Sequence, residues 1–84
     1  MLLDPTSLQV FVSAVEEGRI AKAAARERIA PAAVSRRLSE LELALKTQLF
    51  SRSNKGVLPT TAGLTLIGLA RQVLHDINDV YAQM

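Results

Sequence analysis

The 84-residue sequence contains no cysteine and no tryptophan, and its single histidine is His75. Without cysteine the chain can form no disulfide framework and offers no thiolate. One histidine alone is too little for a metal site or a nucleophilic triad. Asp76 and Asp79 are interpreted as a solvated pair, and the four scattered glycines form no phosphate-binding loop. We therefore expect no enzyme activity, no metal and no cofactor.

Long apolar runs are also missing, since none approaches the roughly 20 residues that a membrane span needs. The first five residues lack the basic region and apolar stretch of a signal peptide. With 49% hydrophobic and 21% charged residues, the composition is typical of a globular protein. We expect one small cytoplasmic domain without a membrane partner, whose modest core would gain from dimerisation.

Charge is unevenly distributed along the chain, although the net charge is only +2. Residues 1–18 carry three acids and no base, whereas residues 19–37 carry six bases and one acid. Residues 57–84 are slightly acidic. A basic block between acidic flanks can bind phosphate, but a solvated basic face is about as common a cause of this pattern.

Apolar periodicity and capping residues predict three helices in the first half of the chain. Asp4 is expected to cap a helix over 5–17, and a short helix follows over 20–28. Pro31 disfavours helical geometry at the residue before it and suits the first position of a third helix, over 31–45. Two helices joined by so short a turn form a helix-turn-helix unit. Because any small helical protein can contain such a unit, it is weak evidence for DNA binding by itself.

A short β-hairpin is predicted over 49–59, because two apolar pieces flank an Asn-Lys-Gly turn. Thr60 or Thr61 then caps a final helix that runs to residue 84. At about 36 Å that helix is too long to be covered by the preceding elements. Its heptad stripe therefore predicts pairing with the same helix of a second copy. The expected dimer contacts are Leu66, Ala70, Val73, Ile77 and Val80.

Two stretches together resemble the DNA-binding domain of the LysR-type transcriptional regulators. The first runs from Ile20 to Glu42 and contains Ala-Ala, Ala-Val-Ser-Arg-Arg-Leu and Leu-Glu; the second is Leu-Phe-Ser-Arg followed by Pro-Thr-Thr-Ala-Gly, ending at Gly63. The resemblance covers essentially the whole chain. It implies a mainly α fold, a winged helix-turn-helix with a three-helix core and a short β-hairpin wing, plus a long C-terminal dimerisation helix.

The resemblance implies a domain over 1–59, with the helix-turn-helix at about 20–39 and the wing at about 49–59, and a linker helix over 60–84. In this family a ligand-sensing domain normally follows. That domain is absent here, so the chain is expected to be either an excised fragment of a longer regulator or a standalone protein without effector control. The fragment is favoured, because the chain stops within the heptad stripe. A small-molecule effector would act only through the absent domain.

The implied partner is double-stranded DNA, read by the helix over 31–45 in the major groove, with the wing on the backbone or in the minor groove. The family's base-reading positions fall on Pro31, Ala32, Ser35 and Arg36, and its wing arginine falls on Arg52. The full set of expected DNA contacts is Lys22, Pro31, Ala32, Ser35, Arg36, Arg37, Ser39, Arg52 and Lys55.

Simpler interpretations remain open at several of these positions. Arg36 can meet guanine O6 and N7 with its planar guanidinium, or can pair with Glu40 one turn away. Ala32 can touch a thymine methyl group or simply fill the helix. Lys55, at the tip of a turn, can contact phosphate or remain solvated.

The sequence also departs from the usual family pattern. Ala30-Pro31-Ala32 replaces Ser-Gln-Pro at the start of the recognition helix, and Arg19 replaces a serine that often caps the preceding helix. Lys46 stands where a glycine is usual, and Glu27 stands where a core leucine is usual. A carboxylate on an apolar face is costly unless it is paired, so we expect Glu27 to escape to the surface at the helix end.

Two other functions are compatible with a small helical domain. A helical interaction module would dimerise or capture a partner helix through 61–84 without binding DNA, and the basic block argues against it. Membrane binding is less favoured, because the basic residues share no helix with a strong exposed apolar stripe.

Overall fold

The computed structural model describes residues 3–53 and 56–84, except for the side chains at 52 and 53. Within these residues the order is α1 (Pro5–Glu17), α2 (Ile20–Glu27), α3 (Pro31–Leu45), β1 (Phe50–Ser53), β2 (Gly56–Pro59) and α4 (Thr61–Gln83). This order confirms the predicted mainly helical winged helix-turn-helix, and each predicted element agrees with the observed one to within a residue.

Local capping explains where most helices begin and end. The Asp4 carboxylate accepts a hydrogen bond of 2.7 Å from the Ser7 N–H, and Thr60 caps α4 in the same way through Gly63. By contrast, α2 and α3 begin without a side-chain cap, at Arg19 and Ala30. Both departures from the family pattern therefore leave a helix N-terminus uncapped by a side chain.

The C-termini of the helices show how the chain accommodates Lys46 where the family usually has glycine. Gly18 ends α1 in the left-handed region, with φ of 76°. Arg28 after α2 and Lys46 after α3 adopt the same region, with φ of 59° and 53°. Lys46 thus takes the backbone conformation that suits glycine, at some cost in free energy, because a β-carbon disfavours it.

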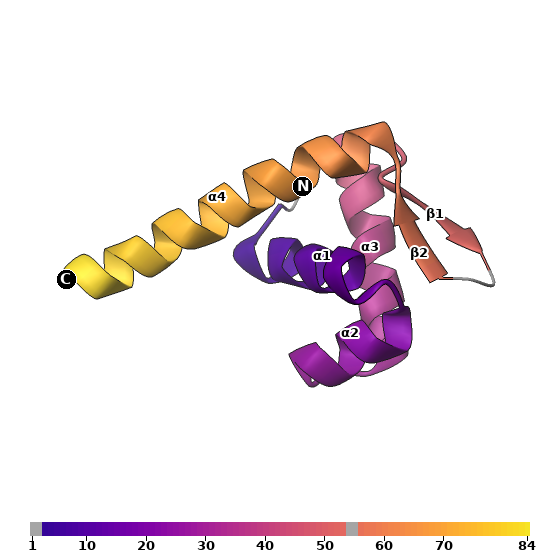
Figure 1. Ribbon diagram of the computed structural model, residues 1–84, viewed down its shortest axis with the longest axis horizontal. Coiled ribbons are helices and arrows are strands. Elements are labelled where there is room, and N and C mark those ends of the chain that lie inside the picture. Colours follow the sequence, from indigo (N-terminus) through magenta and orange to yellow (C-terminus); the bar gives the residue numbers. More distant parts are fainter. Residues whose placement is uncertain (1–2, 54–55) are drawn as a thin grey trace.

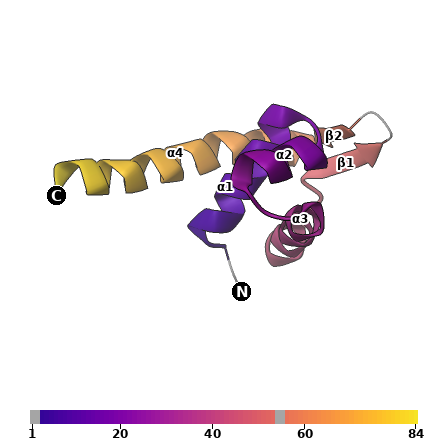
Figure 2. The same ribbon diagram turned by 90° about the horizontal axis from the view of Figure 1, so that it is seen from below.

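Helix α1 is the centre of the molecule, because α2, α3 and α4 all pack against it. Phe11 of α1 is fully buried, together with Val34 and Leu38 of α3. Figure 1 shows α4 leaving this bundle on the side opposite the hairpin, and Figure 2 shows the same arrangement from below. The first half of α4 therefore belongs to the domain, whereas its second half projects.

The hairpin is joined to the turn between α1 and α2. Its two strands pair antiparallel, with Phe50 opposite Pro59 and Arg52 opposite Val57. The Val57 N–H donates a 2.9 Å hydrogen bond to the carbonyl of Gly18. A β-carbon on Gly56 would lie 2.2 Å from that carbonyl oxygen, so glycine is required for this approach. The wing is thereby held beside the start of α2.

No helix in the described part of the chain is both long and apolar enough to cross a membrane.

Candidate nucleic-acid interface

Helix α3 presents two distinct faces. Val34, Leu38 and Leu41 are buried against the core, as their spacing predicts. The opposite face contains most of the residues expected to contact bases. Pro31, Ala32, Arg36 and Ser39 are exposed, and Ser35 is half-buried. The sequence therefore turns one continuous face of α3, from its first turn to Ser39, toward solvent.

The adjacent arginines of α3 lie in different environments. Arg36 is exposed and has no hydrogen bond or ion pair with any other described residue, Glu40 included. Arg37 instead points to the start of α1, where its Nη1 atom donates to Ser7 Oγ at 3.3 Å and lies 3.9 Å from Asp4 Oδ1. Arg36 is thus available to a ligand, while Arg37 joins α3 to α1.

The Asp4 carboxyl is correspondingly stabilised in its charged form. The backbone and hydroxyl hydrogen bonds from Ser7 hold its pKa below the ordinary value, and the nearby charge of Arg37 acts in the same direction. One carboxylate therefore both caps α1 and faces the recognition helix.

Acidic residues of α1 also neutralise part of the basic block. Arg26 Nη1 lies 2.8 Å from Glu16 Oε1 and 3.3 Å from Glu17 Oε2. Hydrogen bonds from Arg71 and Arg26 lower the pKa of Glu16. The basic residues of this block that stay exposed outside such pairs are Arg19, Lys22, Arg28 and Arg36. The predicted backbone contact Lys22 is accordingly accessible on α2.

The two wing residues expected to contact DNA lie partly or wholly outside the described residues. Arg52 lies on β1 opposite Val57, but its side chain is outside the described residues. Lys55 is outside them altogether. Their expected DNA contacts stay predictions.

The expectation for Glu27 was wrong. Its side chain is 17% exposed and does not escape to the surface. Its Oε2 atom accepts hydrogen bonds from Ser13 Oγ and from Gln9 Nε2, and Arg26 Nε is 3.8 Å away. Both hydroxyl and amide come from α1, so the carboxylate bridges α1 and α2. The polar pair on α1 was the available signal, but its pairing with Glu27 required the tertiary structure.

The heptad stripe of α4 is divided between two roles. Ala70 is 1% exposed and Leu66 packs on the domain's own core, so neither presents its side chain freely to a second copy. The expected dimer contact at Ala70 is therefore corrected, because that side chain belongs to the domain's own core. Val73 and Val80 are exposed and Ile77 is half-buried. Leu69, which is not among the expected contacts, is 61% exposed next to this stripe.

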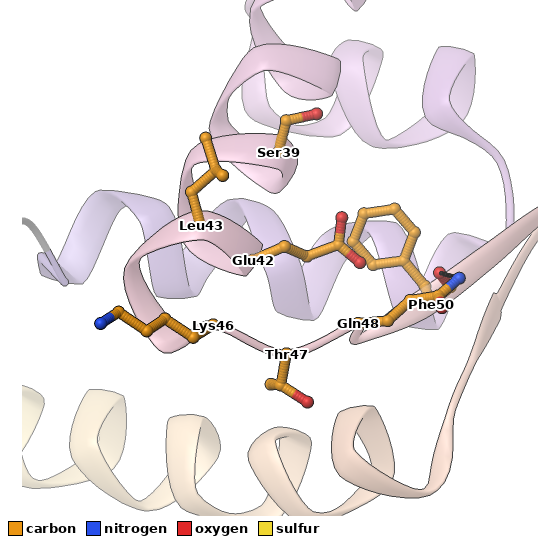
Figure 3. Close-up of a pocket in the computed structure, with 7 residues that line it drawn as sticks. All are labelled: Ser39, Glu42, Leu43, Lys46, Thr47, Gln48 and Phe50. Atoms are coloured by element: carbon orange, nitrogen blue, oxygen red, sulfur yellow. Dashed lines mark hydrogen bonds between the residues drawn. The ribbon is translucent and has the colours of Figure 1, made fainter.

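A shallow depression of about 830 Å³ lies where α3 meets the loop to β1. Figure 3 shows Ser39 and Leu43 on α3 above it, with Phe50 on the side of the hairpin. Glu42 accepts a 2.8 Å hydrogen bond from the Leu49 N–H and so fixes this loop. The depression continues the exposed face of α3 beyond Ser39, and the exposed Leu43 makes it more apolar there.

The helix-turn-helix of α2 and α3, the attached hairpin and the long α4 define a winged helix-turn-helix domain. Residues 5–64 match the family described as "Bacterial regulatory helix-turn-helix protein, lysR family". Because this match spans well over half of the chain, the chain belongs to the LysR family of bacterial regulatory proteins. Homologues of the chain are transcriptional regulators with a DNA-binding helix-turn-helix domain and not enzymes.

Curated relatives agree with this assignment. The chain is 36% identical over 77 residues to the HTH-type transcriptional regulator GltR of Bacillus subtilis (strain 168), which covers 92% of the chain and 26% of the relative. It is 40% identical over 68 residues to the HTH-type transcriptional regulator ClcR of Pseudomonas putida, and this alignment covers 81% of the chain and 23% of the relative. The chain thus spans about a quarter of the length of these relatives.

Solved structures share the fold along nearly the whole chain. The CbnR_DBD–DNA complex matches with a TM-score of 0.93 and 27% identity, covering 96% of this chain and 93% of that one. The BenM_DBD/benA site 1 DNA complex matches with a TM-score of 0.92 and 30% identity, and the match covers 96% of this chain and 94% of that one. Both of those domains were solved with DNA.

Proposed function

We propose that this domain binds duplex DNA sequence-specifically, as a homodimer, within a cytoplasmic LysR-type transcriptional regulator. Helix α3 enters the major groove and the hairpin lies on the backbone or in the minor groove. The observation that carries the proposal is the exposed face of α3, where Arg36 is free of partners among the described residues while Arg26 and Arg37 are held by acids of the same chain.

Arg36 is the residue proposed to read a base. A guanidinium can donate two parallel hydrogen bonds to guanine O6 and N7, a pattern that distinguishes G·C from the other pairs. Pro31 and Ala32, which carry no polar side chain, let the first turn of α3 approach the base edges closely, and Ala32 can contact a thymine methyl group. Lys22 and Arg52 are proposed to contact phosphate, which fixes position without reading sequence.

The dimer is proposed to form through the exposed apolar stripe of α4 that begins at Leu69. Leu69, Val73 and Val80 are exposed there, and Ile77 is half-buried. A second copy is the partner that two-fold symmetry provides, because the same stripe can then cover itself. The small-molecule effector of such a regulator is assigned to a separate domain.

The test begins by selecting bound duplexes from a mixed-sequence pool and titrating the best one by fluorescence anisotropy at two salt concentrations. Binding should weaken by about 0.9 log units per phosphate contact for each tenfold rise in salt. The selected site should be a pseudo-palindrome, since a symmetric dimer places two recognition helices on it. A folded dimer that binds no duplex even at low salt would refute the proposal.

A matched pair of variants then tests the role of Arg36. Arg36→Ala should weaken binding to the selected site by about 5- to 150-fold, the equivalent of about 1–3 kcal/mol, and affect random DNA much less. Arg37→Ala removes the same charge from the same helix and should leave the discrimination between the two DNAs nearly unchanged. Equal losses on both DNAs for Arg36→Ala would reduce that residue to a phosphate contact.

A further inference from the structure

Glu16, near the end of α1, contacts two helices at once. Its Oε1 atom lies 2.8 Å from Arg26 Nη1 of α2, and its Oε2 atom lies 2.7 Å from Arg71 Nη2 of α4. Arg71 is 55 residues away in sequence. One carboxylate thus joins the helix-turn-helix unit to the long helix, with each oxygen committed to a different arginine.

Arg71 lies at the point where α4 leaves the core of the domain. Ala70 is the last buried residue of α4, and Leu74 is the last one that packs on the core. Beyond this point α4 projects alone (Figure 1). The ion pair therefore lies where the apolar seam between α1 and α4 ends. It restrains the direction in which the free part of α4 leaves the domain.

From this geometry we propose that Glu16 is a positioning residue: by holding Arg71 of α4 and Arg26 of α2 together, it sets the angle between the projecting helix and the recognition helix. This inference rests on the proposed DNA-binding dimer. In such a dimer that angle determines how far apart the two recognition helices lie, and hence which half-site spacing is bound.

The part of α4 from Arg71 onward is long enough for a small tilt to displace its end by a distance comparable to the rise of one base pair. From Arg71 to Gln83, α4 extends about 18 Å. A tilt of about 10° displaces its end by about 3 Å. That displacement is close to the rise of one base pair along a strand, about 3.4 Å. A small change of angle at Glu16 therefore corresponds to roughly one base pair of spacing between half-sites.

Exposed ion pairs add little to stability, so the expected effect lies in geometry. The test compares binding to duplexes that carry two selected half-sites at the preferred spacing and at spacings one base pair shorter and longer. Glu16→Ala should reduce the preference for the selected spacing by about two- to fivefold. Its affinity for a single half-site should match that of Glu17→Ala, which removes the same charge from the same helix and also loses a contact with Arg26.

Glu17→Ala is the matched control. It removes the same charge from the neighbouring position and loses a contact with Arg26, but Glu17 makes no contact with α4 in the described ion pairs. It should keep the preference for spacing. Arg71→Gln should reproduce the effect of Glu16→Ala, and the double variant should lose no more than either single one. An unchanged spacing preference in Glu16→Ala would overturn the inference.

A second measurement does not depend on DNA. Because the chain has no cysteine, Ala25→Cys on α2 and Asn78→Cys on α4 provide two unique sites for nitroxide labels, and both positions are exposed. Label-to-label distances are measured in doubly labelled protein diluted with unlabelled protein. Glu16→Ala should broaden or shift the distance distribution, and Glu17→Ala should not.

An identical distribution in all three proteins would refute the positioning role, even if DNA binding is established. If the distance distribution changes in Glu16→Ala but the protein binds no duplex, the positioning role of Glu16 is supported and the proposed function is refuted. The two measurements thus separate failure of the inference from failure of the function on which it rests.

Discussion

Two glycines of α4 provide the sharpest test of the packing described here, because the same substitution should have opposite effects at the two positions. A β-carbon built on Gly63 would lie 2.0 Å from the carbonyl oxygen of Leu49. A β-carbon on Gly68 would meet nothing within 4 Å. Gly68 lies in the interior of α4, where intrinsic helix propensity favours alanine, whereas Gly63 lies in the first turn, where at most the same preference applies.

Leu49 cannot easily move away from Gly63. Its carbonyl oxygen accepts a 2.9 Å hydrogen bond from the Thr60 N–H, and its own N–H donates to Glu42 at 2.8 Å. Its side chain is 1% exposed. Relieving the clash requires a shift of at least about 1 Å in a backbone segment anchored at both ends. The overlap therefore has to be absorbed by distorting the start of α4 or by breaking the bond to Thr60.

The expected magnitudes follow from these contacts. Overpacking costs about 1–3 kcal/mol and the bond to Thr60 about 1 kcal/mol, against a propensity gain of up to about 1 kcal/mol. Gly63→Ala should thus lower the free energy of unfolding by about 2 kcal/mol. Gly68→Ala should raise it by about 0.5–1 kcal/mol.

Thermal and urea unfolding followed by far-ultraviolet circular dichroism measure both effects. Protein concentration is held constant, because the Tm of a dimer depends on it. For a domain of this size the Tm should fall by about 8–16 °C in Gly63→Ala and rise by a few degrees in Gly68→Ala. A Gly63→Ala protein as stable as the unchanged one would refute the close approach of α4 to Leu49.

Two further predictions concern buried and paired carboxylates. Ser13→Ala removes the hydroxyl that donates to Glu27 and should destabilise the domain by about 1–2 kcal/mol in urea unfolding, because the carboxylate keeps only Gln9 and a distant Arg26; an unchanged midpoint would contradict this network. For Glu16, hydrogen bonds from Arg71 and Arg26 lower the pKa in the folded state below the ordinary 4.5. The unfolded chain therefore binds more protons there, and the associated stability, complete above about pH 4.5, is lost as the pH falls below it. Urea unfolding across this pH range should show that the free energy of unfolding depends less on pH in Glu16→Ala than in the unchanged protein. Identical pH dependences in the two proteins would contradict the prediction.

Local signals in the sequence were sufficient for the secondary structure. Asp4, Gly18, Pro31 and Thr60 each act within a few residues of themselves, through a cap, a left-handed turn or a fixed φ. For this reason the helix bounds and the wing could be predicted. The exposed face of α3 followed equally well, because helical periodicity alone decides which residues share a face.

The sequence by itself thus determined the elements, their order and the residues that α3 turns outward. Only the tertiary structure decided which charges remain free and which apolar residues of α4 are already covered. Arg37 and Arg71 meet acids that lie 33 and 55 residues away. Glu27 finds its hydroxyl partner 14 residues away, on another helix. Such contacts depend on how helices pack against each other, and periodicity within one helix carries no information about the residue that faces it across the core.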